Sequence, residues 1–365
     1  MTPHAATPHA ATPDAATPDA AMLSDTLVVV PCLDEEAHID ALLAQLRRTA
    51  PGALIVVADG GSRDRTRAVV RRHAGESALV RLLDNPRRIQ SAAVNRAVER
   101  FGADRSTLVR IDAHCLYPDD YVVTLLREAA RTGADSVVVA METRGRGAVQ
   151  CAVAAAQNGR IGNGGSAHRS ASTAGEWVDH GHHALMRIKA FRAVGGYDET
   201  FTHNEDAELD LRLAAAGFRI WLTRETAAVY LPRDTFGGLW RQYRAYGRGR
   251  ARTVLKHRAR PRLRQMVPLA VAPALLALPA APFAAAAVPP LGLLMALPAL
   301  LWLGVCALSG LRAAWSARRF ALALAGPAAA TMHAAWSFGF WEQLARHLGP
   351  ATAPAPLPAE REAVR

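Results

Sequence analysis

Carboxylate side chains follow several short apolar runs in the first third of the chain. Glu35, Asp59 and Asp112 each lie at the end of such a run or on the turn that follows it. A carboxylate in this position can accept hydrogen bonds from a base or a ribose, or hold a divalent cation. The ordinary alternative is a cap or dipole partner at a helix start, so none of the three is decisive alone.

The turn that starts at Asp59 reads Asp59-Gly60-Gly61-Ser62. Its two glycines permit a tight turn and a close approach of a ligand to the backbone. A plain strand-to-helix turn with Ser62 as N-cap explains the same residues equally well. The turn alone leaves both interpretations open.

Asp112 and His114 are separated by one residue, so in an extended segment their side chains share a face. Such a pair can grip a divalent cation that bridges the two phosphates of a nucleoside diphosphate and neutralises charge on the leaving group. An Asp-x-His pair is commonplace, and it gains weight only beside other motifs.

A further acidic group lies at residues 203–210, ahead of a predicted amphipathic helix. Asp206 falls near the helix start, where a carboxylate facing a cleft could remove a proton from an acceptor hydroxyl. The alternative is a solvated acidic first turn, favoured by the helix dipole. For Glu208 and Asp210 we favour this alternative.

Two more polar clusters could take part in binding. The arginines of residues 242–250 could hold a pyrophosphate or the head groups of anionic lipids, and the two roles are compatible. His180, His182 and His183 could line an acceptor site or form a structural turn, and we favour the acceptor site.

Short apolar runs alternate with amphipathic helical patterns through the first part of the chain. The predicted strands are residues 27–30, 54–58, 79–83 and 108–111. This alternation is typical of an α/β fold with a mostly parallel sheet covered on both faces. Ligands of such sheets bind beyond the carboxyl ends of the strands, which is where the acidic residues lie.

The C-terminal third is built differently. Residues 265–311 contain no charged side chain, which is enough for two membrane helices with a turn at Pro289-Pro290. Residues 320–341 are a third uncharged stretch that could span a membrane or lie re-entrant. Basic clusters at 256–264 and 312–319 place both flanks in the cytoplasm by the positive-inside rule. A buried helical core is the disfavoured alternative.

These patterns divide the chain into four parts. Residues 1–22 repeat Thr-Pro-His/Asp-Ala-Ala and are predicted to be disordered, without the features of a signal peptide. A catalytic domain is expected over 23–255, a basic juxtamembrane segment with two to three transmembrane helices over 256–345, and a flexible tail over 346–365. The formal net charge of +11 fits a membrane or phosphate partner, and no C-x-x-C pair occurs among the four cysteines.

In this order the motifs resemble family 2 glycosyltransferases of the GT-A fold, a Rossmann-like mixed α/β sheet, over residues 26–255. The resemblance is carried by five segments, at residues 30–36, 59–62, 112–114, 195–199 and 204–206. Residues 85–95 and 177–183, together with the C-terminal spans, are most similar to the succinoglycan-biosynthesis glucosyltransferases.

The resemblance implies roles for individual residues. Asp206 would be the catalytic base, and Asp112 with His114 would hold Mg²⁺ or Mn²⁺. His114 replaces the second acid of the usual Asp-x-Asp, which suits Mn²⁺ better than Mg²⁺. His182, His183 and Glu205 would lie on the acceptor side. The nucleotide-sugar would contact Pro31, Glu35, Asp59, Gly60, Asn95, Asp112, Gln242 and Arg248.

The expected activity is inverting transfer of a sugar, expected to be glucose, from a UDP-sugar to a lipid-linked acceptor. The acceptor would be a saccharide on polyprenyl diphosphate, used in exopolysaccharide or cell-surface glycan synthesis at the cytoplasmic face of the inner membrane. Gln242 lies where processive relatives carry Gln-x-x-Arg-Trp, but the sequence there reads Gln-Tyr-Arg-Ala-Tyr-Gly, which disfavours a processive synthase. A polyprenyl-phosphate sugar transferase and a membrane scaffold with a degenerate domain stay open. A dinucleotide-binding oxidoreductase is disfavoured because no G-x-G-x-x-G motif follows the first predicted strand. Nucleic-acid binding is not expected.

Overall fold

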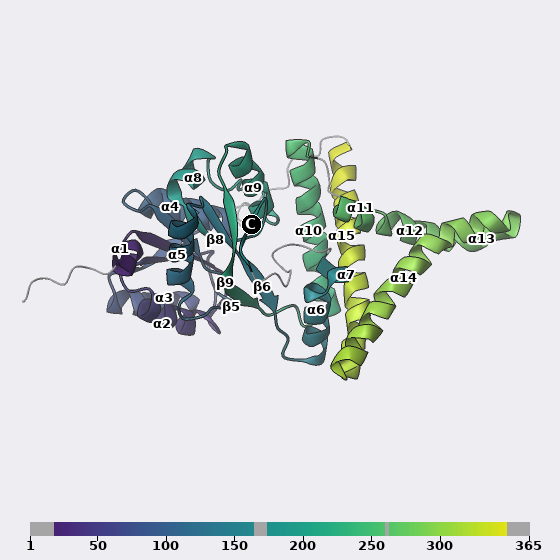
Figure 1. Ribbon diagram of the computed structural model, residues 1–365, viewed down its shortest axis with the longest axis horizontal. Helices are drawn as coiled ribbons and strands as arrows, with labels where there is room; N and C mark the ends of the chain where they lie inside the picture. The colour runs from purple at the N-terminus through teal and green to yellow at the C-terminus, as the bar shows by residue number, and fades with distance from the viewer. Residues whose placement is uncertain (1–17, 164–173, 260–262, 349–365) are drawn as a thin grey trace, which may run out of the picture.

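The computed structural model describes residues 18–163, 174–259 and 263–348 (Figure 1). Its strands are β1 (Thr26–Cys32), β2 (Leu54–Asp59), β3 (Val80–Asp84), β4 (Thr107–Arg110), β5 (Cys115–Leu116), β6 (Ser136–Thr143), β7 (Glu176–Val178), β8 (His182–Arg187) and β9 (Ile220–Tyr230). The helices of the α/β domain are α1 (Pro18–Ser24), α2 (Ile39–Thr49), α3 (Thr66–Glu76), α4 (Gln90–Phe101), α5 (Tyr121–Thr132), α6 (Ala148–Asn158), α7 (Arg160–Asn163), α8 (Ile188–Ala193) and α9 (Glu205–Ala215).

The remaining helices form the C-terminal part. They are α10 (Phe236–His257), α11 (Leu263–Leu269), α12 (Val271–Ala277), the 3-10 helix η2 (Leu278–Ala280), α13 (Ala281–Ala287), α14 (Pro289–Ala317), the 3-10 helix η3 (Phe320–Leu324) and α15 (Ala325–Leu348). Figure 1 shows α10 and α15 side by side next to the α/β domain, with α13 and α14 reaching away from it.

One mixed sheet organises the α/β domain. Its strand order is β3-β2-β1-β4-β8-β6-β9-β5, with β7 paired to β9. The β1, β2, β3 and β4 pairings are parallel, as the sequence predicts. Strand β8 runs antiparallel to both β4 and β6, so its first residues lie at the same edge as the carboxyl end of β4. This reversal brings a segment from the middle of the chain to the edge where ligands bind.

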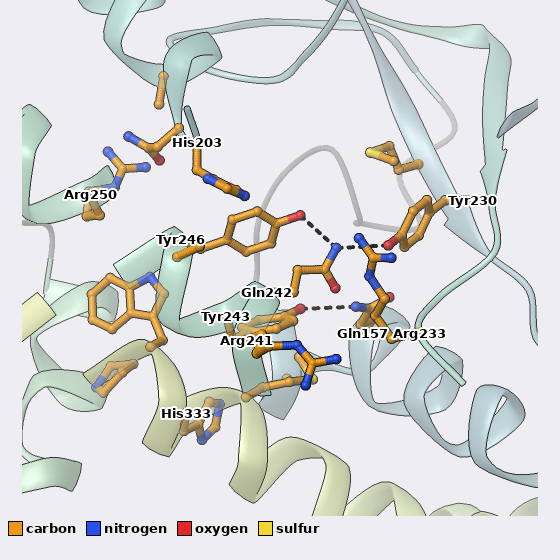
Figure 2. Close-up of a pocket in the computed structure, with 18 of the residues that line it drawn as sticks. Gln157, His203, Tyr230, Arg233, Arg241, Gln242, Tyr243, Tyr246, Arg250 and His333 are labelled. Atoms are coloured by element: carbon orange, nitrogen blue, oxygen red, sulfur yellow. Dashed lines mark hydrogen bonds between the residues drawn. The ribbon is translucent and has the colours of Figure 1, made fainter. Parts of the chain in front are cut away.

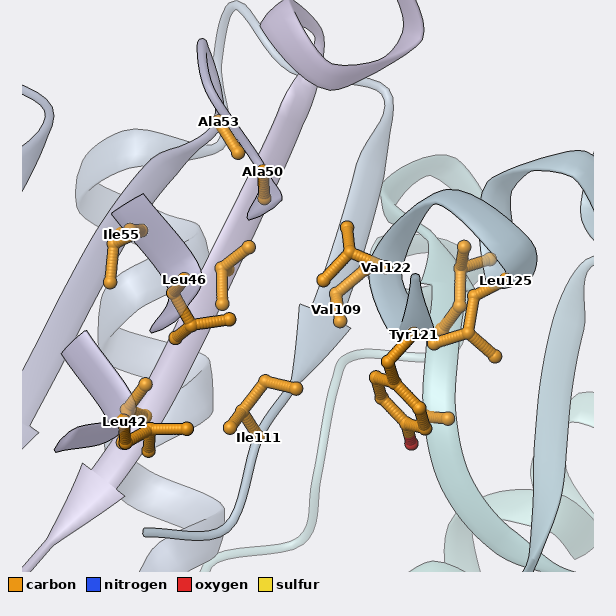
Figure 3. Packing of buried hydrophobic residues seen from close by; sticks show 14 of the residues in the cluster. Leu42, Leu46, Ala50, Ala53, Ile55, Val109, Ile111, Tyr121, Val122 and Leu125 are labelled. Atoms are coloured by element: carbon orange, nitrogen blue, oxygen red, sulfur yellow. The ribbon is translucent and has the colours of Figure 1, made fainter. Parts of the chain in front are cut away.

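Alternation along β1 explains why both faces of the sheet are covered. Val28 and Val30 pack with α2, α3 and α5 on one face, whereas Leu27 and Val29 pack with α4, α8 and α9 on the other. Figure 3 shows part of the first cluster, where Leu42 of α2 and Leu125 of α5 approach the sheet. A strand buried on both faces reads as a continuous apolar run, which is the pattern seen in the sequence.

Helix α1 differs from the prediction of disorder through residue 22. It begins at Pro18, and Leu23 near its end is buried in the core. Asp19 pairs with Arg127 of α5 at 2.5 Å. Proline is tolerated in the first turn of a helix, and the Ala-Ala-Met-Leu run after it favours helix once Leu23 can be buried. The rest of the predicted segment, residues 1–17, lies outside the described residues.

The uncharged stretches form helices of two kinds. Met266–Ala287 and Pro289–Ala317 are long and apolar enough to cross a membrane, and 17% of the hydrophobic window in each is buried. The helical conformation is interrupted between them at Val288, which is extended and directly precedes the predicted Pro289-Pro290 turn. Residues 320–341 instead contribute to η3 and α15, and α15 packs against α10 and α6. That third stretch is not among the candidate spans of the described residues.

Candidate active site

A cleft of about 1290 Å³ lies between the edge of the sheet and the C-terminal helices. The carboxyl end of β4, the start of β8 and the start of α9 meet at this edge, and α10 faces them across the cleft. The residues that line the side of the α/β domain include Gln90, Asp112, His114, His182, Glu205 and Asp206. The structure therefore brings the predicted base, the predicted metal ligands and part of the predicted acceptor side into one cavity.

Asp206 is held by a guanidinium from the neighbouring strand. Arg110, which is 3% exposed, places Nη1 2.6 Å from Oδ1 and Nη2 3.1 Å from Oδ2 of Asp206. The hydroxyl of Tyr197 also donates to Oδ1 at 3.1 Å. Burial opposes ionisation of Asp206, but Arg110 and then His183 outweigh it, so its pKa lies well below the usual range. Asp206 is a fixed anion whose two oxygens are both engaged.

A buried chain of hydrogen bonds supports Asp206 from behind. Asp210 accepts from Nε2 of His183 at 2.6 Å, and its other oxygen lies 2.8 Å from Nδ1 of His180. Nδ1 of His183 lies 2.8 Å from the Tyr197 hydroxyl. Burial lowers the pKa of His183, but the charges of Asp210 and Asp206 outweigh it and raise that pKa. A protonated His183 donates at both ring nitrogens, so the chain orients Tyr197 toward Asp206.

Glu205 differs from the adjacent Asp206 in its hydrogen bonding and in its pKa. It lines the cleft, and within the described residues no side chain of another residue forms a hydrogen bond or ion pair with its carboxylate, whose own backbone N–H is its hydrogen-bond partner. Burial, followed by the negative charge of Asp206, raises its pKa to about 7. The two adjacent acids thus have opposite properties: one is a fixed anion, and the other can exchange a proton near neutral pH.

Asp112 faces the same space from the segment after β4. It accepts from Nε2 of Gln90 at 3.1 Å, and Nε2 of His182 lies 3.6 Å from its second oxygen. Burial and the charge of Arg110 lower the pKa of His182 to about 4, which keeps that ring neutral. Nε of Arg110 lies 3.6 Å from the first oxygen, beyond a normal hydrogen bond. Asp112 therefore keeps lone pairs for a further ligand.

His114 is oriented by Glu35, which comes from the turn after β1. Nδ1 of His114 lies 2.9 Å from Oε1 of Glu35. A carboxylate can only accept, so Nδ1 carries the proton and Nε2 is the nitrogen left for a ligand. This hydrogen bond raises the pKa of His114 against the opposing effect of burial. The carboxylate of Glu35, which was predicted to contact the nucleoside, is therefore hydrogen-bonded to His114, a predicted metal ligand.

Asp59 and Gly60 line a second, smaller hollow of about 320 Å³ rather than the main cleft. Asp59 accepts from the backbone N–H groups of Gly61 and Ser62, and Arg67 bridges it to Asp84. The side chain of Asp59 is fully buried. Pro31 lies at the end of β1, in register with Ala58, so β1 separates this hollow from Asp112 after β4.

The turn after β1 is fixed to the turn after β2. The backbone N–H of Glu35 donates to Thr66 at 2.8 Å, and that of Asp34 donates to Ser62 at 2.9 Å. In return the backbone N–H of Arg63 donates to the Asp34 carboxylate at 2.7 Å. These bonds keep the two acidic turns at one edge of the sheet.

Gln242 of α10 lines the main cleft, and Figure 2 shows it between Tyr230 and Tyr246. Its Nε2 donates to the hydroxyls of Tyr230 at 2.9 Å and Tyr246 at 3.1 Å, whereas its buried Oε1 has no partner. Whichever way the amide is turned, one of its polar atoms lacks a protein partner. Buried polar groups are normally satisfied, so this atom fits a hydroxyl of a bound sugar.

Several predicted site residues lie elsewhere. Asn95 uses its whole amide on the turn before α9, bonding Tyr197 and Glu199. Arg248 pairs with Glu342 of α15 at 2.8 Å and does not line the cleft. Both residues were predicted to contact the nucleotide-sugar, and in this structure their polar groups are engaged by other protein residues. His183, predicted on the acceptor side, is buried behind the cleft, where its Nδ1 lies 2.8 Å from the Tyr197 hydroxyl and 3.3 Å from Oδ1 of Asp206.

The interpretation of Glu208 and Asp210 as solvated acids was wrong. Both side chains are fully buried. Glu208 pairs with Arg212 of its own helix and with Lys256 and His257 of α10, while Asp210 pairs with His183 of β8 and with His180 just before that strand. Apart from Arg212, these partners lie outside α9, so the local sequence pattern of the helix does not contain them.

The sequence reasoning missed Arg110, Gln90 and Tyr197. A signal for Arg110 was present, because a charged residue inside an otherwise apolar strand needs a buried partner. No comparable signal marks Gln90 or Tyr197, whose neighbours are set by the fold.

A mixed sheet with carboxylates at the carboxyl edge of its parallel half, facing a helix-borne acidic pair, defines a GT-A glycosyltransferase fold. A family model described as "Glycosyl transferase family 2" matches residues 27–195. Over 327 residues, 88% of this chain and 95% of the relative, the sequence is 53% identical to "Succinoglycan biosynthesis protein ExoA" of Rhizobium meliloti (strain 1021).

A solved structure shares the fold. It is the mannosyltransferase PcManGT from Pyrobaculum calidifontis in complex with GDP-Man and Mn²⁺, with a TM-score of 0.53 and 21% identity, covering 88% of this chain and 87% of that chain. Together with the family match and the close relative, these findings show that the chain belongs to glycosyl transferase family 2 and is a glycosyltransferase.

Proposed function

We propose that this glycosyltransferase moves a sugar, with glucose expected, from a UDP-sugar to a saccharide linked to polyprenyl diphosphate. The observation that carries the proposal is that Asp112 and the Glu205–Asp206 pair face one cleft. Donor activation and proton removal need acidic groups of these two kinds close together. The name of the 53% identical relative supports a role in the synthesis of succinoglycan or a similar exopolysaccharide.

Asp112 and His114 fit a divalent cation, Mg²⁺ or Mn²⁺. Glu35 fixes the tautomer of His114, as carboxylates do for metal-bound imidazoles, and the mixed oxygen and nitrogen donors favour Mn²⁺. Within the described residues no group of three or more His, Cys, Asp or Glu side chains could enclose a cation. The other ligands would then be phosphate oxygens of the donor. When bound, the cation supplies charge neutralisation for the departing diphosphate.

We propose that Glu205 accepts the proton with the help of Asp206, whereas the sequence predicted Asp206 itself as the base. Asp206 remains an anion at neutral pH, but Arg110 makes it a weak base. Its negative charge raises the basicity of Glu205, whose pKa of about 7 suits proton acceptance at neutral pH. Glu205 therefore receives the proton, and Asp206 keeps Glu205 basic.

The reaction is proposed to be a single displacement. The acceptor hydroxyl oxygen bonds to the anomeric carbon as the bond from that carbon to UDP breaks, and the hydroxyl proton passes to Glu205. Attack from the face opposite the leaving group inverts the anomeric centre. Gln242, with one unsatisfied polar atom, is suited to hold a hydroxyl of one of the sugars.

The two apolar helices support a place in the inner membrane. Basic residues flank them at 256–264 and at Arg312, Arg318 and Arg319. The positive-inside rule puts these flanks, and with them the catalytic domain, in the cytoplasm. Two spans return the chain to the side from which it entered.

A donor panel tests the proposal. Membranes carrying the chain would be given labelled UDP-sugars and bacterial lipid extract, and label in the lipid phase would be scored. One UDP-sugar should label the lipid in a single addition, through a sugar-to-sugar linkage. A linkage directly to phosphate would indicate a polyprenyl-phosphate transferase, and a long product would indicate a processive synthase. Absence of both UDP release and label would favour a scaffold.

A further inference from the structure

The cleft does not end at the catalytic residues. It continues between the C-terminal helices, where it is lined by Val271 and Ala274 of α12 and by Pro298 and Trp302 of α14. These residues belong to the two helices that could cross a membrane. The same cavity therefore joins the acidic edge of the sheet to the space between two membrane-type helices.

The size of the cavity leaves room for a second substrate. Pockets for single small ligands usually measure about 300–1,000 Å³, and this cleft is about 1290 Å³. Its polar end carries the acids, and its other end is apolar. A ligand that fills both ends needs a polar head and a hydrocarbon chain.

Arg241 lies on the α10 side of this cavity, among the residues labelled in Figure 2. Within the described residues it has no hydrogen bond or ion pair, whereas Arg244 and Arg248 on the same helix both pair with Glu342. Arg241 is an exposed residue at the wall of the open cleft. A guanidinium without a counter-charge there attracts an anion, and phosphate oxygens fit its planar fork.

A second cleft arginine lies nearer the donor side. Arg233 lines the cleft three residues after Tyr230, which pairs with Cys115 in the sheet and whose ring centroid lies 6.5 Å from that of His114. This places Arg233 beside the predicted metal ligands. Arg241 is thus the better candidate for a phosphate group that does not belong to the donor.

The apolar wall is fastened to the catalytic domain by polar side chains. Nε1 of Trp302 donates to Nδ1 of His333 on α15 at 3.2 Å. Nε2 of His333 then donates to the carbonyl oxygen of Ile161 in α7 at 2.9 Å. This chain fixes α14 and α15 against the α/β domain, so the apolar end keeps its position relative to the acids.

We propose that the diphosphate of the lipid-linked acceptor binds at Arg241 and that its isoprenoid chain leaves the cleft between α12 and α14. The inference rests on the proposed function, since it gives the acceptor of that reaction a place. The chain lies along Val271, Ala274, Pro298 and Trp302 and enters the bilayer sideways, while the saccharide reaches Glu205.

Equilibrium binding to the purified chain in detergent micelles tests the proposal, with four probes. They are undecaprenyl diphosphate, farnesyl diphosphate, inorganic pyrophosphate, and UDP with Mn²⁺. Arg241→Gln should weaken binding of both lipid diphosphates about tenfold, the effect of losing one charge-assisted contact, and should leave UDP binding unchanged. Arg244→Gln, on the same helix but outside the cleft, is the matched control.

A second variant tests the path of the chain. Ala274→Trp should weaken undecaprenyl diphosphate binding about tenfold but spare inorganic pyrophosphate, because it fills the apolar end only. Ala286→Trp, on the same apolar segment but not lining the cleft, should change neither. Retained UDP binding in each variant shows that the protein is folded.

Three results would overturn the inference. Arg241→Gln could weaken UDP binding as much as lipid binding, which would assign Arg241 to the donor. Phosphatidylglycerol could displace undecaprenyl diphosphate at equal concentration, which would make the site one for bilayer head groups. Ala274→Trp could leave undecaprenyl diphosphate binding intact. None of these readouts requires turnover, so a wild type that binds the lipid but transfers no sugar would contradict only the proposed function.

Discussion

The guanidinium of Arg110 grips the carboxylate of Asp206 with contacts of 2.6 and 3.1 Å, although 96 residues separate the two in the chain. The pair joins β4 to the start of α9 and lies directly beside Glu205. Removing one partner of such a buried pair typically costs about 3–5 kcal/mol, because the other charge is left without compensation. The pair therefore fixes the fold at the cleft and sets the electrostatic environment of the adjacent acid.

Glu205→Gln should reduce kcat by about 10²- to 10⁴-fold, the usual contribution of a general base. The wild-type kcat/KM should rise with pH through about 7, because Glu205 must lose its proton before it can accept another. That rise should be absent in the variant. Initial rates of UDP release between about pH 5 and pH 9 measure both effects.

Asp206→Asn provides the comparison. It removes the negative charge that raises the pKa of Glu205 and leaves the positive charge of Arg110 nearby, so the rise in rate should move to lower pH. The rate itself should fall steeply, because Glu205 becomes a weaker base, while UDP binding should be largely retained. An unshifted profile in this variant, or full turnover in Glu205→Gln, would show that the two acids are not coupled as proposed.

Glu35→Gln should weaken Mn²⁺-dependent binding of UDP by about 10- to 100-fold, the range seen when a group that orients a metal ligand is lost. Its carboxylate fixes the tautomer of His114, and an amide can present either a donor or an acceptor to Nδ1. Titration of UDP at fixed Mn²⁺ measures the change.

Glu36→Gln is the matched control for that experiment. Glu36 lies on the same turn, but its carboxylate binds the exposed Arg65 and not the cleft. UDP binding should be unchanged in this variant. Equal losses in the two variants would mean that Glu35 acts on the turn as a whole and not on His114.

Asp210→Asn should lower the free energy of unfolding by about 3–5 kcal/mol near pH 5.5, because it leaves His183 buried without its counter-charge. Burial raises the pKa of Asp210, but His183 and His180 outweigh it and lower that pKa, so the stabilisation by Asp210 is present above about pH 3.9 and is lost at lower pH.

The histidine of this pair sets the other limit of the pH window. The pKa of His183 is raised in the folded state, so its contribution is complete below about pH 6.5 and fades as pH rises through the folded value. The difference in Tm between wild type and Asp210→Asn should thus be largest between about pH 4 and pH 6.5. Thermal unfolding at pH values inside and above that window measures it, and an identical difference at both would contradict the assignment.

The parallel half of the sheet could be predicted because its information is local. Each strand is a short apolar run, and the polar residues that follow it fall at one edge whatever the rest of the chain does. Asp59, Asp112 and His114 were placed at this edge in this way, while their roles stay predictions. The antiparallel strand β8 carries no such signal, since His182-His183-Ala184-Leu185 reads equally well as a loop.

The errors all involve side chains whose partners lie far away in the sequence. Glu208 and Asp210 look like a solvated first turn until α10 supplies Lys256 and β8 supplies His183. Asn95 and Arg248 carry groups that could bind a nucleotide, but the fold places a turn and α15 against them. The sequence shows which residues are charged, but only the fold shows which oppositely charged residue lies beside each of them.

Gly247 of α10 and Gly339 of α15 let the two helices touch through their backbones. A Cβ at Gly339 would lie 2.1 Å from the carbonyl oxygen of Arg244, and one at Gly247 would lie 2.0 Å from that of Trp336. Gly339→Leu should therefore push α15 away from α10, at a cost of about 1–3 kcal/mol or more. Because α15 carries His333, the apolar end of the cleft should open.

Transfer to the lipid-linked acceptor should then fall sharply while UDP with Mn²⁺ still binds, since the acids are carried by the sheet and α9. Gly304→Leu is the control, because a Cβ at Gly304 on α14 would meet no atom within 4 Å. Comparing lipid labelling with UDP affinity in both variants separates damage to the acceptor side from unfolding. If Gly339→Leu kept wild-type lipid labelling, the contact between α10 and α15 would not position the acceptor, and the apolar wall would act without it.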